Sequence, residues 1–425
     1  MAVRKFLVIS IDCLRYDALS RTNPCLDTPK FDILTRDYEL ADRFFVTAPA
    51  TRPSHTSLFT GLYPFEHGLF GQTYLKMFDG VTNLMHLLQQ QGFDVSGHSE
   101  RPDVFRFLDY EACIGPMDPA ARNQCLGSME PVLNVLDDGG DTPQLRFMHF
   151  WYAHGGYGLS GIELQPGLQE LVHSGRTEEA LRYYYAAAVQ IQEFRIVEIL
   201  KRIDLNEWAV FLFGDHGEGF DPEIMSHGDL IHQNVARVPL LAHLPLADWH
   251  LPDGTLSMID LFPTICDLAG VDAGYCGYGR SLVGAQPPHN LPLRDLPFRD
   301  RWVLTELDSL YGVGFLHPGN LEIEHRRVTS RLAIDEKRLE RNPQGTRQWS
   351  ISDGKMLFRY DEISGEHVLR DMATGEDLEC DNPAPYRKKY QELIEGSAYG
   401  DLRTQDETDD EKAVLEQRLK DLGYL

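Results

Sequence analysis

One short segment of the chain combines a hydroxyl side chain with the local sequence of a helix start. It runs Ala48-Pro-Ala-Thr-Arg-Pro-Ser-His-Thr-Ser-Leu-Phe-Thr-Gly61 and places Thr51 ahead of Pro53. Proline restricts the residue before it, so we expect Arg52 to be extended and the following Ser-His-Thr-Ser to cap and open a helix. A hydroxyl at the positive end of a helix suits attack on an anionic substrate. Taken by itself, the segment is more consistent with an ordinary loop rich in proline and serine.

Two predicted strands end in residue types that bind metal ions. Lys5 to Ile11 is an apolar run typical of a buried parallel strand, and Asp12 follows it. The still more hydrophobic run Ala209 to Gly214 leads to Asp215 and His216. Ligands bind beyond the carboxyl ends of strands in open α/β sheets, and carboxylate and imidazole together suit Zn, Mn or Fe. For Asp12 the alternative interpretation is a helix N-cap.

Other histidines are predicted to lie just beyond strands. A short strand at 93–96 precedes His98, for which a surface loop is an equally good interpretation. The apolar run 146–151 leads to His154, where the glycines that follow allow backbone to approach a ligand closely. The candidates for binding a substrate or its reacting group are His98, His154, Tyr157, His227 and His232.

The elements that must position these residues fill a long chain. Its 425 residues suggest one large α/β domain and a smaller one. We expect the large domain at 1–285, with 103–143 as an insertion or cap, and the smaller domain at 286–425. Residues 178–202 are predicted to form a helix that packs on the sheet. Antiparallel hairpins are predicted around 355–360 and 367–370, with a closing helix at 412–422.

Composition limits the partners and the compartment. The chain has 65 acidic and 40 basic residues and a formal charge of −25, which argues against nucleic acid or an anionic membrane as a main partner. An anionic substrate then needs a local positive charge, such as a metal ion. The apolar run before Asp12 is too short for a signal peptide, and no window reaches the ~20 apolar residues of a membrane helix. The seven scattered cysteines favour free thiols in a cytoplasmic protein, although a Cys113–Cys125 bridge stays open.

The motifs, taken in order, resemble the sulfatase branch of the alkaline phosphatase superfamily. The resemblance implies an α/β fold with a large mixed, mostly parallel central sheet flanked by helices, and a small C-terminal antiparallel sheet plus helix. It also implies one divalent metal ion beside the nucleophile, with Zn or Mn preferred over Ca or Mg. The residues that carry it are Ile11-Asp-Cys-Leu-Arg-Tyr-Asp17, Thr51 to Gly61, Gly214-Asp-His-Gly-Glu218, Arg237-Val-Pro-Leu-Leu241, Ile259-Asp-Leu-Phe-Pro-Thr264 and Leu419-Lys-Asp-Leu-Gly-Tyr-Leu425.

The resemblance also implies roles for individual residues. The metal ligands would be Asp12, Thr51, Asp215 and His216. His154 matches a histidine near the leaving group and would be the general acid, while His227 would stabilise the transferring group. Arg52 stands next to the nucleophile as a further catalytic candidate. Apart from the resemblance, we take His55, His98, Tyr157 and His232 as candidates for binding substrate and interpret Arg15 and Asp17 as a structural ion pair.

This sequence departs from the family pattern at the nucleophile. Sulfatases carry Cys or Ser there, oxidised to formylglycine, with an arginine four residues on. Here these positions are Thr51 and His55, and the second aspartate of the usual pair is Cys13. A threonine cannot form that aldehyde, so no formylglycine is expected.

The departure favours a metal-dependent hydrolase that cleaves a phosphodiester, phosphonate or related ester through a covalent intermediate on Thr51. A sulfate or sulfamate ester hydrolase that uses unmodified Thr51 is the first alternative. A phosphoryl-group transferase and a catalytically silent binding protein also stay open. We expect a small anionic ester as the partner, with no nucleic acid and no membrane, and leave homo-oligomer formation open.

Overall fold

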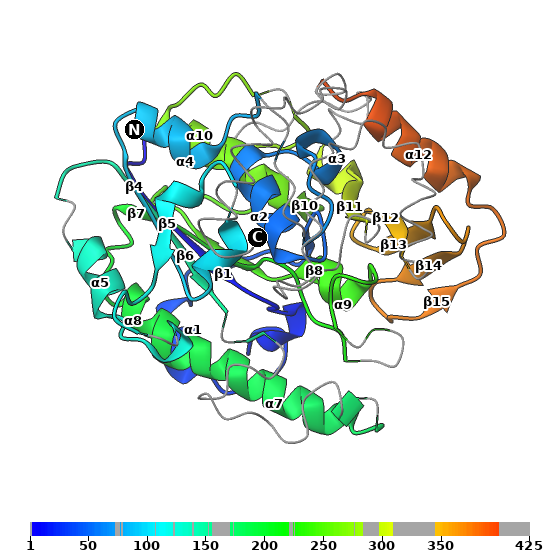
Figure 1. Cartoon of the computed structure of the whole chain (residues 1–425), viewed down its shortest axis with the longest axis horizontal. Helices are drawn as coiled ribbons and strands as arrows, with labels where there is room; N and C mark the ends of the chain where they lie inside the picture. Colours follow the sequence, from blue (N-terminus) through cyan, green and yellow to red (C-terminus); the bar gives the residue numbers. More distant parts are fainter. Residues whose placement is uncertain are drawn as a thin grey trace, which may run out of the picture.

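A seven-stranded sheet forms the centre of the molecule (Figure 1). The computed structural model describes residues 2–72, 77, 80–106, 108–121, 124–137, 140–151, 153–154, 171–172, 174–220, 224, 226–275, 277–283, 297–308 and 345–398. The strand order is β2-β9-β7-β1-β6-β4-β5. The strands are β1 (Lys5–Ile11), β2 (Glu39–Leu40), β4 (Asp94–Ser99), β5 (Ile114–Pro116), β6 (Gln144–Phe150), β7 (Trp208–Gly214) and β9 (Leu240–His243).

The middle of this sheet is parallel and almost entirely buried. β1 pairs with β6 on one side and β7 on the other, and β4 and β5 extend the parallel set. Every residue of β6 and β7 is buried. This burial explains the continuous apolar run of β7, whereas β6 also buries the polar side chains of Gln144, Arg146 and His149. The expected mostly parallel central sheet is confirmed.

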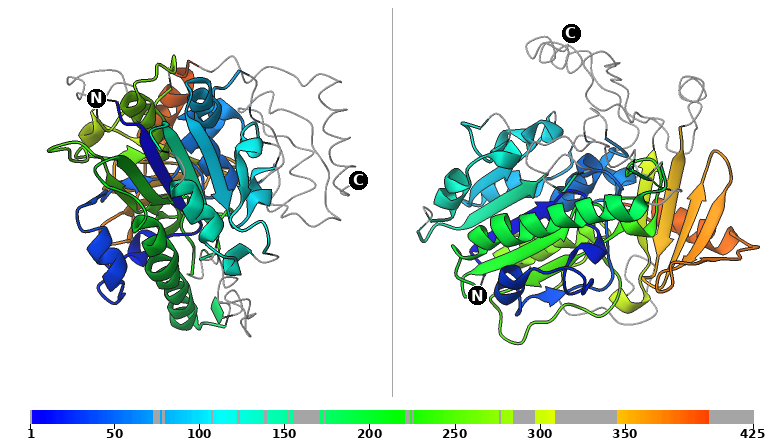
Figure 2. Two further views of the ribbon diagram at one scale, coloured as in Figure 1. Left: turned by 90° about the vertical axis from the view of Figure 1, so that its left-hand side faces the viewer. Right: turned by 90° about the horizontal axis from the view of Figure 1, so that it is seen from below.

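Helices cover both faces of the sheet (Figures 1 and 2). One apolar core includes Leu58, Leu84 and Ile265 from α2, α4 and α10, and the other includes Phe31, Val132 and Ala180 from α1, α5 and α7. The helices are α1 (Pro29–Leu34), α2 (Thr51–Thr60), α3 (Pro64–His67), α4 (Leu84–Gln90), α5 (Glu130–Asp137), α7 (Thr177–Gln190), α8 (Val197–Leu200), α9 (Gln233–Ala236), α10 (Leu261–Ala269) and α12 (Ala384–Glu395). Within the described residues, no helix combines the length and apolar character that a membrane crossing requires.

Several predicted elements have different bounds in the structure. The helix expected at 178–202 consists of α7, a π-helical turn at Ile191–Ile196 and α8. The run 237–243, expected as one strand, is divided by Pro239, which has no N–H for a sheet ladder. Its second half, β9, pairs antiparallel with β7, whereas β8 (Arg237–Val238) joins a small sheet with β3 (Phe44–Phe45) and β10 (Leu256–Ser257). Residues 103–143, expected as an insertion or cap, contribute edge strand β5 to the central sheet.

A second, antiparallel sheet lies towards the C-terminus (Figure 2). It contains β11 (Val303–Asp308), β12 (Arg347–Ser352), β13 (Met356–Asp361), β14 (His367–Asp371) and β15 (Asp377–Leu378). The predicted hairpin around 355–370 is confirmed by the antiparallel pairing of β13 with β14. α12 covers the sheet, with Tyr390 stacked on Trp349 at 4.1 Å between ring centroids. The helix predicted at 412–422 lies outside the described residues.

Strand β11 is bonded directly to the segments on either side of α2. The Glu306 N–H donates to the Thr47 carbonyl at 2.8 Å, and the Thr305 hydroxyl donates to the Val46 carbonyl at 2.7 Å. The Glu306 carboxylate accepts from the Phe65 N–H at 3.0 Å. The C-terminal sheet is therefore part of the support of the Thr51 segment.

Candidate active site

Helix α2 begins at Thr51 itself, and all ten of its residues are buried. The prediction that Arg52 would be extended and that the helix would open after it is wrong. Pro53 lies in the first turn, where its missing N–H needs no partner and its fixed φ suits a helix. Gly61 ends the helix at φ 71°, and a Cβ there would meet the Tyr275 ring at 2.8 Å. The early start places the Thr51 hydroxyl at the positive end of the helix.

The strand ends bring the predicted ligands to Thr51. Ile11 pairs with Gly214 across β1 and β7, so Asp12 and Asp215 emerge side by side. The Thr51 Oγ1 lies 3.1 Å from Asp12 Oδ2 and 3.3 Å from His216 Nε2. The Ser54 hydroxyl donates to the Asp215 carbonyl at 2.6 Å, which fixes α2 against the end of β7. The structure therefore brings Asp12, Thr51, Asp215 and His216 into one buried cluster.

The electrostatics of this cluster fit a cation. Asp215 Oδ1 accepts from the N–H groups of Cys13 and His216 at 3.3 and 2.9 Å, but its Oδ2 is buried without a hydrogen-bond donor among the residues that the structure describes. Burial and then the charge of Asp12 raise the pKa of Asp215 well above its ordinary value. Burial opposes ionisation of Asp12 too, but a hydrogen bond to His149 and nearby histidines outweigh it and lower its pKa. Adjacent buried carboxylates with one unmatched oxygen are a donor set that suits a divalent ion.

His154 and His227 lie beside this cluster, and their pKa values are shifted in opposite directions. The His154 ring stacks on Trp151 at 3.8 Å between ring centroids, and burial lowers its pKa to about 3 against the opposing charge of Asp12. The His227 Nδ1 lies 3.1 Å from Glu218 Oε2. Burial alone would lower the pKa of His227, but the Glu218 carboxylate outweighs burial and raises it. The two ring centroids are 5.0 Å apart, so two imidazoles whose pKa values are shifted in opposite directions face the same space.

His149, which was not predicted from the sequence, also lies against the cluster. His149 on β6 has its Nε2 3.4 Å from Asp12 Oδ2 and its Nδ1 2.8 Å from the Ser99 hydroxyl. Its ring is 5.0 Å from the ring of His55. One feature could have identified it. His149 is the single histidine of β6, all of whose residues are buried, and β6 pairs with the strand that leads to Asp12.

His55 lies beneath the nucleophile, enclosed by protein. Its Nδ1 is 2.7 Å from the Thr51 carbonyl, and its Nε2 is 2.8 Å from the Ser10 hydroxyl. Aromatic rings of Phe59, Phe105 and Phe147 surround it. The contacts join β1 to the first turn of α2, so His55 positions Thr51 in this structure.

Three other predicted site residues are not brought into the cluster. The guanidinium of Arg52 donates to the carbonyls of Val104 and Arg106 at 2.7 and 2.8 Å. His98 lies inside β4, which continues to Ser99 because its backbone pairs with β6 beyond the predicted end at 96. His232 caps α9 by accepting from the Asn234 N–H and also contacts Arg370 of the C-terminal sheet. Tyr157 lies outside the described residues.

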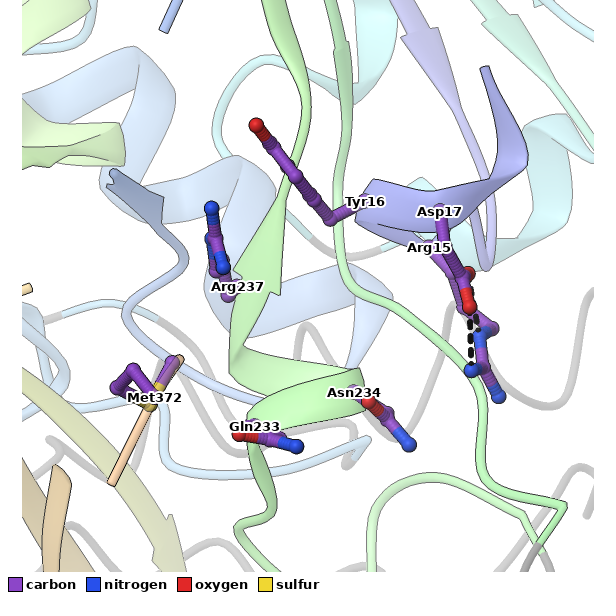
Figure 3. Close-up of a pocket in the computed structure, with 7 residues that line it drawn as sticks. All are labelled: Arg15, Tyr16, Asp17, Gln233, Asn234, Arg237 and Met372. Atoms are coloured by element: carbon purple, nitrogen blue, oxygen red, sulfur yellow. Dashed lines mark hydrogen bonds and ion pairs between the residues drawn. The ribbon is translucent and has the colours of Figure 1, made fainter. Parts of the chain in front are cut away.

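A polar pocket of about 90 Å³ opens on the chain that follows β1 (Figure 3). Arg15 and Asp17 form the expected ion pair on one side of it, at 2.8 Å. Arg237 lies over the ring of Tyr16, with the guanidinium carbon 3.8 Å from the ring centroid. The remaining lining residues are Gln233, Asn234 and Met372. Arg15 also donates to the Glu218 carbonyl at 3.4 Å, which links this pocket to the His227 partner.

Residues 4–271, more than half of the chain, match the family model described as Sulfatase. The chain belongs to the sulfatase family. Among curated proteins, the ulvan-active sulfatase of Formosa agariphila is 23% identical over 270 residues, which cover 60% of this chain and 52% of that protein. The match thus spans about half the length of this relative.

Solved structures of other proteins share the fold of this sulfatase-family chain. The phosphonate monoester hydrolase of Agrobacterium radiobacter has a TM-score of 0.65 at 18% identity, covering 95% of this chain and 96% of that one. A 2-O GAG sulfatase has a TM-score of 0.60 at 16% identity, covering 98% and 92% of the two chains. At such identities the likeness establishes the fold, and the activity has to be argued from the site.

Proposed function

We propose that this sulfatase-family protein is a metal-dependent hydrolase of phosphodiesters or phosphonate monoesters, with Thr51 as nucleophile. The observation that carries the proposal is the position of the Thr51 hydroxyl. It is buried at the start of α2, 3.1 Å from Asp12 and 3.3 Å from His216. A hydroxyl there can attack an anionic centre while the helix terminus offsets negative charge.

The identity of the nucleophile favours phosphorus over sulfur. A formylglycine hydrate can release sulfate by collapsing to the aldehyde, and threonine has no such route. In the proposed reaction the Thr51 hydroxyl loses its proton, which passes to the solvent, and its oxygen forms a bond to phosphorus as the bond to the leaving oxygen breaks. Water then attacks the phosphorus, the bond between phosphorus and the Thr51 oxygen breaks, and a proton from the water restores the hydroxyl. The similarity to a phosphonate monoester hydrolase supports this choice of substrate class.

Asp12, Asp215, His216 and the Thr51 oxygen would hold the metal ion. When bound, such an ion lowers the pKa of the hydroxyl and offsets charge on the substrate oxygens. Asp12 accepts from the Thr51 hydroxyl and so fixes the direction of its proton. His55 holds the Thr51 carbonyl and the start of the helix in place.

His227 and His154, which lie beside the cluster, have the two remaining roles in the proposed reaction. Glu218 raises the pKa of His227 and so favours its protonated form, which would stabilise negative charge on the transferring group. His154 is neutral in the free enzyme, and a bound anionic substrate would raise its pKa and allow it to protonate the leaving oxygen.

The substrate class is tested with a panel of aryl esters on the full chain. The panel contains a phosphodiester, a phosphonate monoester, a phosphomonoester and a sulfate, assayed after chelation and after reloading with Zn, Mn, Ca or Mg. We expect the first two to have the highest kcat/KM, with activity lost on chelation and restored by metal. A sulfate ester as the best substrate would contradict the choice of phosphorus. No turnover with any metal would contradict the hydrolase assignment.

The role of His154 is tested by the chemistry of the leaving group. His154→Ala should reduce kcat on an ester with a poor alkyl leaving group by about 10²- to 10⁴-fold, the usual contribution of a general acid. With a nitrophenyl leaving group, which needs no proton, the loss should be far smaller. An equal loss on both esters would show that His154 acts only through its packing on Trp151.

A further inference from the structure

We propose that the Cys13 thiolate is a ligand of the metal ion and that the site therefore selects a thiophilic ion, such as zinc, over calcium or magnesium. This inference rests on the metal site of the proposed function, and it adds a ligand type and an ion preference to that site. The ligands assigned above are oxygen and nitrogen only, and a sulfur ligand changes which ions the site retains.

The first support is the location of the Cys13 sulfur. It is fully buried, 3.0 Å from Asp12 Oδ1 and 3.6 Å from His227 Nδ1. Candidate ligand atoms that lie within 4.8 Å of one another include Cys13 in two combinations, with His216 and His227 and with Asp12 and His154. Asp215, whose Oδ2 has no hydrogen-bond donor among the described residues, belongs to an overlapping combination with Asp12 and His216. The thiol thus lies among the same groups that would surround the ion.

The spacing of these atoms suits one ion held between them. Tetrahedral bonds of about 2.0 Å to oxygen and about 2.3 Å to sulfur place two ligand atoms roughly 3.5 Å apart. The observed separations between proposed ligand atoms are 3.0 Å from the Cys13 sulfur to Asp12 Oδ1 and 3.8 Å from His216 Nε2 to Asp12 Oδ1. Small side-chain adjustments therefore suffice for coordination.

The backbone of Cys13 supports the same conclusion. Its φ is +58°, a left-handed backbone conformation that residues other than glycine seldom adopt. Both of its peptide groups are fixed, since its N–H donates to Asp215 Oδ1 at 3.3 Å and its carbonyl accepts from the Tyr184 hydroxyl at 2.8 Å. Strained residues held this way are common where a side chain must be presented to a ligand.

Coordination replaces the sulfur–hydrogen bond by a sulfur–metal bond, and the released proton passes to the solvent. Soft thiolate favours zinc, cadmium or cobalt, whereas calcium and magnesium prefer sites made of oxygen. A carboxylate in place of the thiol should therefore reverse the preference.

The experiment uses the full chain, stripped of metal and titrated with cobalt(II). Wild type should develop the near-ultraviolet absorption of a sulfur-to-cobalt charge transfer, and Cys13→Ser should bind cobalt without it. Cys266→Ser is the matched control, because this buried free thiol lies in α10 and not in the cluster. Cys13→Asp should shift competition between zinc and magnesium towards magnesium by at least about tenfold, in line with ligand softness.

The possible results separate the two proposals. Cobalt binding to wild type without the charge-transfer absorption would overturn the role of Cys13 and leave the metal site standing. Absorption that survives Cys13→Ser would likewise overturn it. No binding of cobalt or zinc by wild type would overturn the metal site of the proposed function itself.

Discussion

Replacement of Thr51 by alanine should lower kcat on an aryl phosphodiester by on the order of 10⁴-fold or more, the scale seen when a nucleophile is removed. The hydroxyl is the only group of this side chain that can form the covalent intermediate. Asp12, Asp215 and His216 remain in the variant, so its metal content should stay near that of wild type. Steady-state kinetics and elemental analysis of the same preparation measure both quantities. Mass spectrometry of acid-quenched wild type should also find a phosphorylated or phosphonylated Thr51.

A matched control separates loss of the nucleophile from damage to the helix. Thr56→Ala makes the same deletion in α2, at a buried residue whose hydroxyl contacts the Arg52 carbonyl and Tyr110. It should leave kcat within a few-fold of wild type, although it costs some stability. Thr51→Ser keeps a hydroxyl and should retain measurable turnover. Undiminished activity in Thr51→Ala would exclude the covalent route through this residue.

Removal of Arg301 should reduce the free energy of unfolding by about 3–5 kcal/mol, the range for breaking a buried ion pair by deleting one partner. Both oxygens of Asp260 accept from Arg301 at 2.8 Å, and side-chain exposure is 4% for Arg301 and 0% for Asp260. Arg301→Ala would leave the Asp260 carboxylate buried without its cation. Urea denaturation followed by circular dichroism measures the effect.

The same measurement has internal controls. The exposed pair of Lys201 and Glu198 is 2.8 Å long, but its side chains are 52% and 50% exposed. Lys201→Ala should cost no more than about 1 kcal/mol. The double variant Arg301→Ala with Asp260→Ala should be less destabilised than the sum of its parts, since no buried charge is left alone. A cost below 1 kcal/mol for Arg301→Ala would contradict the importance of this pair.

The cluster of Asp12, Asp215 and His216 was predictable because its position follows from parallel pairing. Long apolar runs identify buried parallel strands, and the residues after such strands must meet at one edge of the sheet. This inference needs no knowledge of side-chain orientation. The C-terminal hairpin was predictable for a different, local reason: turns that contain glycine delimit β13 and β14.

The positions of the side chains that lie elsewhere than predicted, or that were not predicted, depend on partners distant in the sequence. Arg52 is adjacent to the nucleophile in sequence, but its guanidinium is held by carbonyls 52 and 54 residues away. His98 was read as following a strand, because nothing local shows that β6 extends the pairing to Ser99. His149 was overlooked because its partners, Asp12 and Ser99, lie on neighbouring strands.

The bonds from β11 to the chain around α2 have a consequence for protein synthesis. Thr47 and Phe65 flank the nucleophile helix, yet their partner Glu306 is translated some 240 residues later. While the ribosome is still adding those residues, the Thr47 carbonyl and the Phe65 N–H lack this partner. We infer that the nascent chain acquires the native setting of Thr51 only after residues 303–308 have emerged. Activity should therefore appear late, when all strands of the central sheet have already been made.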